Sequence, residues 1–436
     1  MAPTQEELAP AKKADPLPTD EEDDDPLDDL SDAFQLLNHS HRDMIATTAF
    51  NYYGDRFATG SVDGKIKVYN KNNAGNWVLC DTWGAHNAEV FELQWLHPQL
   101  HPNLIASVGA DGRFRLWVED PTIAPNKGRR FNSHSNKPVW ELRAPNRAPF
   151  LSFSMTFNTE TRHTYLAIIN RNALLTIYEN DQPENLENWV EMDKVNVCEK
   201  PARGEEVSFK VQFDPNLEPC YNALRLGVPR DSLAVVVASM HRASLWRTKE
   251  ISHNVTLGSS SSKELYLATE LKGHRSLVRD ITWAPGNIRG YDIVATACKD
   301  GFVRVFKVET PGKPGEHPTS KDYSKMPEKV VVPQSSAENG GRNTPSGIGA
   351  GLANARPGPS GSRAPDNQGR EGEVLHVATE VSKMAANRVP WRVGFDHDGG
   401  VLGTTGDDGR LVLWRREPSG VWSKSSELAM KMSVPS

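Results

Sequence analysis

The sequence predicts an all-β protein made of six copies of one four-stranded unit, a six-bladed β-propeller. At six places along the 436-residue chain, a tight-turn position is followed six residues later by an aromatic residue. The segment after each turn alternates in polarity, as in Lys65-Ile66-Lys67-Val68-Tyr69, which is typical of a half-buried strand. The turn and aromatic positions pair as Asp63 with Tyr69, Asp111 with Trp117, Asn172 with Tyr178, Met240 with Trp246, Asp300 with Phe306, and Asp408 with Trp414.

Each repeat is expected to contain four strands in order. The first strand ends at an aromatic residue, and the second follows at positions such as 56–60 and 104–108. Four turns then read Asp-Gly, a pair that accepts the positive φ of a two-residue hairpin, whereas the third and fourth repeats carry Asn172-Ala173 and Met240-His241. The aromatic ends are Phe50, Trp95, Phe157, Phe213, Trp283 and Phe395, and the outermost strands are 77–82, 139–142, 189–195, 264–271, 374–381 and 421–428.

Two segments do not fit the repeat. Residues 1–33 are Pro-rich and then acidic, so they repel one another, bury little apolar surface and are expected to be disordered. Residues 310–373 are rich in Pro, Gly, Ser and Asn, and are expected to form a disordered insertion between the third and fourth strands of the fifth blade. Residues 34–309 then supply blades one to five, and residues 374–436 supply the end of blade five and blade six.

Composition argues against several classes of function. The net charge is −6 and no cluster of Lys and Arg stands out, so direct binding to nucleic acid is not expected. The N-terminus lacks the apolar core of a signal peptide and the longest apolar run, 233–238, is too short to span a bilayer, so any membrane association is expected to be indirect. The four scattered Cys residues predict no metal site and no redox motif, and no cofactor is expected.

Two repeats carry a His, a hydroxyl, an Asp and an aromatic residue that could be taken for a nucleophilic triad. These sets are His86, Ser107, Asp111 and Trp117 in the second repeat, and His274, Thr296, Asp300 and Phe306 in the fifth. The recurring turn and aromatic positions resemble those of WD-repeat propellers, and this resemblance implies that such residues hydrogen-bond the strands of each blade together. A catalytic site, by contrast, would occur once. We therefore expect these residues, with the turn residues Asp63 and Asp408, to be structural, and the chain not to be an enzyme.

The number of predicted outer strands exceeds the number of repeats by one. Counting residues 34–38, there are seven candidates for six repeats, and the sixth repeat already has its own strand at 421–428. Residues 34–38 are then left over at one edge of an open ring, unless this strand is a misread frayed terminus. The open edges predict partner contacts at Phe34, Leu36, Met44, Ile45, Val421, Trp422 and Leu428.

Several stretches go beyond a generic WD repeat. They are 273–285 with 293–306, Trp117-Val118-Glu119-Asp120-Pro121 with Gly128-Arg129-Arg130-Phe131, and 41–44 with 57–63. In these stretches the chain resembles the Seh (Sec-thirteen-homologue) nucleoporins, and the resemblance covers residues 38–309 and 384–416. The acidic N-terminus and the insertion depart from that family.

The resemblance implies an open six-bladed propeller that receives a further blade from an elongated α-helical scaffold nucleoporin. It also implies membership of the Y-shaped subcomplex of the nuclear pore, at the nuclear envelope, and of a vacuolar or lysosomal coat of the SEA/GATOR type that regulates TOR signalling. Other subunits of both assemblies are the implied partners. The alternatives are a propeller of the related secretory vesicle coat, and a closed WD-repeat adaptor such as a ubiquitin-ligase receptor.

Overall fold

The computed structural model describes residues 37–125, 127–131, 137–255, 258–286, 290–312 and 372–429. The predicted acidic tail and all but the ends of the predicted insertion lie outside these residues. Contacts divide the chain into residues 1–40 and 41–436, and the described part of the first unit, 37–40, has no regular secondary structure. The remaining description concerns the second unit.

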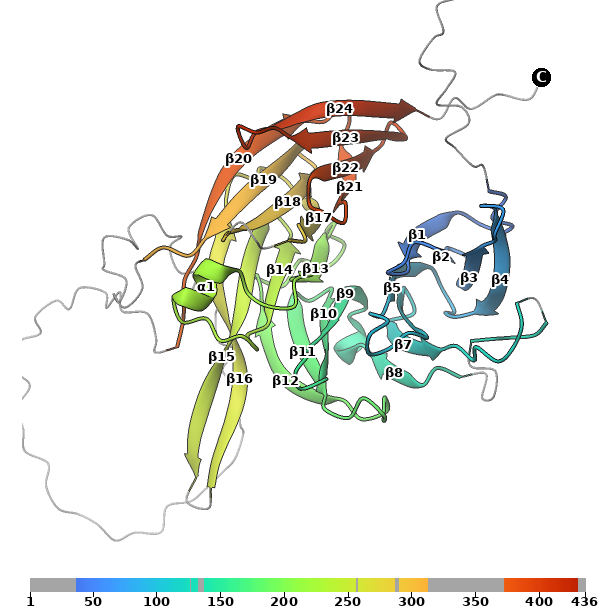
Figure 1. Cartoon of the computed structure of the whole chain (residues 1–436), viewed down its shortest axis with the longest axis horizontal. Coiled ribbons are helices and arrows are strands. Elements are labelled where there is room, and N and C mark those ends of the chain that lie inside the picture. The colour runs from blue at the N-terminus through green and yellow to red at the C-terminus, as the bar shows by residue number, and fades with distance from the viewer. Residues whose placement is uncertain are drawn as a thin grey trace, which may run out of the picture. The chain divides into compact units, whose positions relative to one another are not determined.

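The second unit consists of six antiparallel sheets of four strands each, which confirms the predicted six-bladed, all-β fold (Figure 1). The strands of each sheet follow one another in chain order. Their bounds are β1 Ile45–Phe50, β2 Arg56–Ser61, β3 Lys65–Lys71 and β4 Trp77–Gly84 in blade one; β5 Val90–Trp95, β6 Leu104–Gly109, β7 Arg113–Val118 and β8 Trp140–Arg143 in blade two; β9 Phe150–Phe157, β10 Thr164–Asn170, β11 Leu174–Asn180 and β12 Val190–Asn196 in blade three; β13 Phe209–Phe213, β14 Ala234–Ser239, β15 Arg242–Val255 and β16 Gly258–Leu271 in blade four; β17 Val278–Trp283, β18 Asp292–Cys298, β19 Phe302–Glu309 and β20 Val377–Ala385 in blade five; and β21 Pro390–Phe395, β22 Val401–Gly406, β23 Arg410–Arg416 and β24 Trp422–Ala429 in blade six.

The predicted aromatic residues close the innermost strand of every blade, from Phe50 at the end of β1 to Phe395 at the end of β21. The expectation of two-residue Asp-Gly hairpins is wrong for blades one, two, five and six. Three residues lie between the second and third strands there, as in Ala110-Asp111-Gly112, and the Gly has positive φ, 73° at Gly112. The Asp instead accepts the backbone N–H two residues later, since Arg113 N lies 3.2 Å from Asp111 Oδ1. This is the three-residue hairpin, in which only the last residue needs the left-handed conformation.

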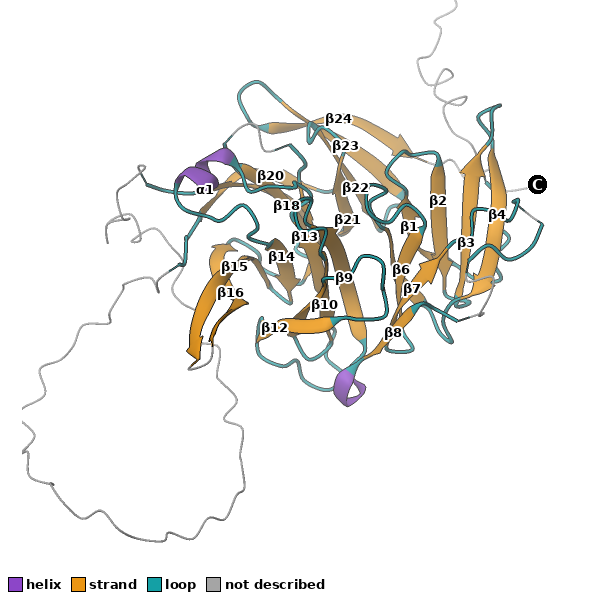
Figure 2. Cartoon of the chain, turned by 60° about the horizontal axis from the view of Figure 1, so that its bottom comes forward, coloured by secondary structure: helices purple, strands orange, loops and turns teal. Residues whose placement is uncertain are grey.

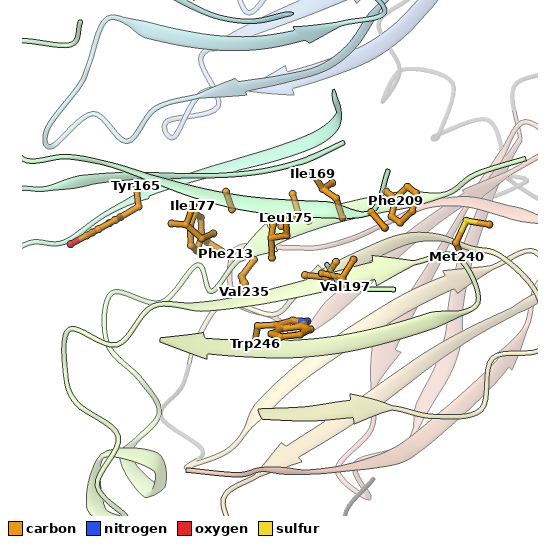
Figure 3. Packing of buried hydrophobic residues seen from close by; sticks show 14 of the residues in the cluster. Tyr165, Ile169, Leu175, Ile177, Val197, Phe209, Phe213, Val235, Met240 and Trp246 are labelled. Carbon is orange, nitrogen blue, oxygen red and sulfur yellow. The ribbon is translucent and has the colours of Figure 1, made fainter. Parts of the chain in front are cut away.

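Apolar side chains between neighbouring blades form the core. Between blades three and four, Tyr165, Ile177, Phe213 and Trp246 belong to one buried cluster (Figure 3). The innermost strands pack side by side in chain order, β1 with β5, then β9, β13, β17 and β21. Each sheet is therefore stabilised mainly by the sheets before and after it, as expected for a repeat fold.

Strands dominate the described chain, and its only α-helix is the short α1, Tyr221–Arg225 (Figure 2). The hairpin of β15 and β16 is much longer than its counterparts and extends away from blade four (Figure 1). Residues 310–376 connect β19 to β20, where the sequence predicts the insertion. None of the described helices has the length and apolar character needed to cross a membrane.

Candidate partner-binding site

The His, Ser, Asp and Trp side chains of blade two meet as the sequence predicts. His86 Nδ1 lies 2.9 Å from Asp111 Oδ1, and His86 Nε2 lies 2.8 Å from Ser107 Oγ. Trp117 Nε1 donates to the same hydroxyl at 2.8 Å. The four residues therefore link the loop before β5, the strand β6, the turn and the strand β7.

The electrostatics of this chain of hydrogen bonds suit a structural role. Burial lowers the pKa of His86 and so disfavours its protonated form, against the opposing effect of Asp111. Burial opposes ionisation of Asp111, but hydrogen bonds from its neighbours outweigh burial and lower its pKa to about 2. Ser107 and its counterpart Thr296 in blade five have no exposed surface, so a substrate cannot reach either candidate nucleophile.

Blades five, one and six repeat parts of the arrangement. His274 Nε2 lies 2.8 Å from Thr296 Oγ1, and Asp300 accepts from Arg304 at 2.6 Å, while Phe306 packs 5.8 Å from the His274 ring. In blade one, His41 lies 2.9 Å from Thr59 Oγ1 and 3.4 Å from Asp63 Oδ2. In blade six the His is absent, Asp408 Oδ1 accepts the N–H of Arg410 at 3.2 Å, and Trp414 Nε1 donates to Thr404 at 3.0 Å.

The repetition supports the structural interpretation. Hydrogen-bond sets that recur in several blades satisfy polar groups inside each blade, whereas a catalytic centre is assembled once. No group of three or more His, Cys, Asp or Glu side chains suitable for a metal occurs within the part of the chain that the structure describes. The surface that distinguishes this propeller lies instead at its two end blades.

The free face of blade six is the clearest sign of an unfinished ring. In blades two to five, the second strand is buried at every position, because a neighbouring blade covers each of its faces. In β22 the burial alternates. Leu402 and Thr404 are buried on the side facing blade five, whereas Val401, Gly403 and Thr405 keep contact with solvent on the other side.

The third strand of blade six repeats this alternation. Val412 and Trp414 are buried toward blade five, whereas Leu411 and Leu413 are only half-buried. Leu428 on β24 pairs with Leu411 and is also half-buried. The free face of blade six, defined here by Val401, Gly403, Thr405, Leu411, Leu413 and Leu428, is therefore an apolar sheet surface.

The central cavity confirms which side of blade six is uncovered. It has a volume of about 1030 Å³ and is lined by the innermost strand of every blade. Only blade six contributes residues beyond its innermost strand, namely Gly403, Thr405 and Leu411. The cavity thus continues sideways onto the free face of blade six. Within the described residues, no strand packing comparable to that of the other junctions joins β21 to β1.

The innermost strand of blade one is the other end of the ring. None of its six residues is buried, unlike the corresponding strands of blades two to five. Large apolar side chains are exposed here, with Met44 72%, Phe50 60% and Tyr53 69% accessible. The two ends approach each other at the loop after β1, where the Tyr52 ring lies 6.4 Å from His397 of blade six.

The residues predicted to contact a partner are placed as follows. Phe34 and Leu36 lie outside the described residues. Met44 and Val421 are largely exposed, and Ile45 lines the central cavity. Leu428 lies on the free face of blade six. Trp422 is not at an open edge: it is 4% exposed and packs between blades five and six, with its backbone N–H donating to Ser382.

Sequence reasoning missed two buried charge networks. Glu119 accepts from both Arg56 and Arg130, at 2.7 and 2.8 Å, and fixes the segment that places Phe131 against Trp83. In the sequence, the stretches that contain Glu119 and Arg130 stand out only by their resemblance to the family. Nothing in the sequence around Glu119 and Arg130 indicates that these two side chains form an ion pair.

The second network joins both ends of the insertion. Arg247 on β15 donates to His376 at 2.7 Å, and His376 in turn lies 3.0 Å from Thr310 Oγ1. Burial and the charge of Arg247 hold the pKa of His376 well below its usual value. These residues are up to 129 positions apart, so no local pattern could have indicated the contact.

The four-stranded blades and their His–hydroxyl–Asp–Trp hydrogen-bond chains define a WD-repeat β-propeller. A family profile described as "WD domain, G-beta repeat" matches residues 34–70 and 265–307. The whole chain is similar to Nucleoporin SEH1 of Chaetomium thermophilum, with 38% identity over 94% of this chain and 98% of that protein. Nucleoporin SEH1 of Saccharomyces cerevisiae is 26% identical over 87% of this chain and 95% of that protein. Nucleoporin seh1 of Schizosaccharomyces pombe is 29% identical over 65% of this chain and 74% of that protein.

The chain belongs to the SEH1 nucleoporin family, which is not catalytic. This confirms the resemblance seen in the sequence and the expectation that the chain is not an enzyme. The function therefore has to be sought in the surfaces that the propeller offers to other proteins.

Proposed function

We propose that this protein is a scaffold subunit of the outer-ring, Y-shaped subcomplex of the nuclear pore, and so supports the transport of protein and mRNA between nucleus and cytoplasm. Membership of a nucleoporin family supports this assignment. The single observation that carries the mode of action is the free face of blade six, which is apolar and which no blade covers within the described residues. A scaffold propeller with such a face is suited to receive a strand assembly from another subunit.

The proposed partner is an elongated α-helical nucleoporin that donates a blade. Three strands from this partner, together with residues 34–38 of this chain, would form a seventh blade between blades six and one. The face would gain the same two-sided burial that β6, β10, β14 and β18 already have. Entry of the blade would also separate the rings of Tyr52 and His397, which now lie 6.4 Å apart.

A second assembly is proposed to use the same face. A coat of the SEA/GATOR type on the vacuolar or lysosomal membrane, which regulates TOR signalling, would incorporate the chain through another blade-donating helical subunit. The membrane association would then be indirect. Occupation of one face by either partner makes the two assemblies mutually exclusive for any single copy of the chain.

Co-expression with the N-terminal fragment of the helical partner tests the proposal. We expect a soluble 1:1 complex, and a chain that is less stable when expressed alone. A fully stable monomer that fails to bind the fragment would contradict it. Native affinity purification would then separate the assemblies, because recovery of secretory vesicle-coat subunits or of a ubiquitin ligase in place of nucleoporins would favour one of the alternatives.

A further inference from the structure

One set of hydrogen bonds between innermost strands runs in a single direction around the ring. A side chain on one blade accepts the outward-facing backbone N–H of the next blade. Glu92 and Gln94 on blade two accept from Phe153 and Met155, at 3.1 and 2.8 Å. Ser152 and Ser154 on blade three accept from Val211 and Phe213, Gln212 on blade four accepts from Trp283, and Asp280 on blade five accepts from Val393, all at 2.9–3.1 Å.

The strand registers place these acceptors at two equivalent positions of the innermost strands, which we call the first and second stitch positions. Not every such position holds an acceptor, since Lys210 stands at the first position of blade four and Ala49 at the second position of blade one. The two positions are separated by one large apolar residue, as in Glu92-Leu93-Gln94 and Asp280-Ile281-Thr282. Blade six has Arg392 and Gly394 at these positions. An Arg side chain cannot accept a hydrogen bond and Gly has no side chain, so blade six has an acceptor at neither position, whereas blade four keeps Gln212 and blade one keeps Thr47.

The N-H groups that a preceding blade would bind are those of Thr48 and Phe50 on β1. The N–H of Asn51 donates to Arg56 O, so the alternation of an antiparallel ladder turns the N–H groups of Thr47 and Ala49 toward β2, and those of Thr48 and Phe50 away from it. No side-chain acceptor reaches either outward group from the part of the chain that is described. The backbone N–H groups of Thr48 and Phe50 are therefore available to acceptors on another chain at this end of the ring.

Arg392 places a positive charge on β21, at the blade-six end of the open ring. Its side chain is exposed on the free side of blade six, and no hydrogen bond or ion pair of this guanidinium is seen among the described residues. The adjacent carboxylate, Asp280, already accepts from Ile281 and Val393. Glu92 shows how a carboxylate at a first stitch position serves two donors, because it accepts both the N–H of Phe153 and the ammonium of Lys210.

We propose, on the basis of the proposed function, that the innermost strand of the donated blade carries Asp or Glu at its first stitch position. This carboxylate accepts the N–H of Thr48 and pairs with Arg392. Two residues later the strand carries Ser, Thr, Asn or Gln, which accepts the N–H of Phe50. The residue between them is large and apolar and covers Gly394 and Gly403, beside which an added Cβ would meet nothing closer than 3.5 Å.

The test uses the full chain and the N-terminal fragment of the helical partner, with Arg392→Glu as the variant. Loss of one partner of a desolvated charge pair, and its replacement by a like charge, is expected to weaken binding at least about 30-fold. Arg203→Glu is the matched control, since Arg203 is exposed in the loop between blades three and four, and its binding should stay within about threefold of wild type. Changing the partner's carboxylate to Arg should restore binding to Arg392→Glu in part, because the charge pair is re-formed with its signs reversed while the N–H of Thr48 loses its acceptor.

A cross-link identifies the carboxylate directly. In the Arg392→Lys variant, a carbodiimide joins the new amine to a carboxylate in contact, and mass spectrometry locates the bond. We expect the bond on an Asp or Glu that precedes, by two residues, a Ser, Thr, Asn or Gln in an extended segment of the partner.

Three outcomes contradict the proposal in distinguishable ways. Failure of the wild-type chain to bind the fragment removes the proposed function itself. A wild-type complex that Arg392→Glu forms equally well removes the stitch inference alone. A cross-link to a helical part of the partner, to a second copy of this chain, or to the acidic segment 1–33 of the same chain also removes it, by showing a different occupant.

Discussion

Adjacent residues of β23 give a sharp test of the free face of blade six. Leu413 is half-buried on the free face, whereas Val412 is 8% exposed and belongs to the cluster between blades five and six. Leu413→Asp should leave the free chain folded and abolish partner binding. Val412→Asp should unfold blade six whether or not a partner is present.

The magnitudes follow from burial. Complete burial of a Leu side chain is worth about 1.5–3 kcal/mol, and Leu413 has only part of this in the free chain, so Leu413→Asp should cost about 1 kcal/mol of unfolding free energy. Under a donated blade, the same carboxylate would be buried without a cation, at a cost of about 3–5 kcal/mol, which weakens binding at least about 100-fold. Val412→Asp incurs a similar cost in the free chain, a large share of the roughly 5–15 kcal/mol that holds a typical domain folded.

Urea denaturation followed by tryptophan fluorescence measures the unfolding free energy of each variant. Isothermal titration calorimetry with the partner fragment measures the binding affinity. Leu413→Ser is a milder control that removes apolar area without adding a charge. Equal binding by wild type and Leu413→Asp would refute the assignment of this face. Loss of folding in Leu413→Asp would show that the face is covered in the free chain.

Further predictions concern the blade-fixing residues. Burial, reinforced by the charge of Arg304, lowers the pKa of His274 from 6.5 to about 4. Because protonation of His274 is less favourable in the folded state, the stability that the neutral His274 provides is present above pH 6.5 and is lost as the pH falls toward 4. The loss amounts to at most about 3 kcal/mol of unfolding free energy. The unfolding free energy of His274→Gln should therefore fall less steeply than that of the wild type over this pH range. A Cβ at Gly109 would lie 2.4 Å from His86 Nδ1, so Gly109→Ala should cost about 1–3 kcal/mol, whereas Gly84→Ala, with nothing within 4 Å, should be nearly neutral; equal melting temperatures would contradict this account.

The repeating features were predictable from the sequence because they arise from local physics. The alternation in each strand and the aromatic at its end follow from burial on a pleated sheet, and β1 through β24 lie close to the predicted segments. The turn type was not predictable from Asp-Gly alone, because both two-residue and three-residue hairpins accept a Gly with positive φ. Blade four shows the difference, since Met240-His241 does form a two-residue connection.

The binding surface was harder to predict than the fold. Strand counting indicated an unfinished ring, yet it placed Trp422 at the edge, because a half-buried strand gives no sign of which of its faces a neighbour covers. The free face instead includes Leu411 and Leu413, which alternate with buried residues like any other strand pair. The hydrogen bonds between blades, and the position of Arg392 among them, depend on registers that only the structure reveals.

Hydrogen–deuterium exchange on the free chain and on its complex with the helical partner tests the central claim most directly. If a donated blade fills the junction between blades six and one, exchange should slow in β1, at Thr48 and Phe50 in particular, and in β21 to β23. Exchange in β9 to β14, on the far side of the ring, should stay unchanged. Slower exchange confined to blades three and four, with β1 and β22 exchanging as in the free chain, would contradict the account.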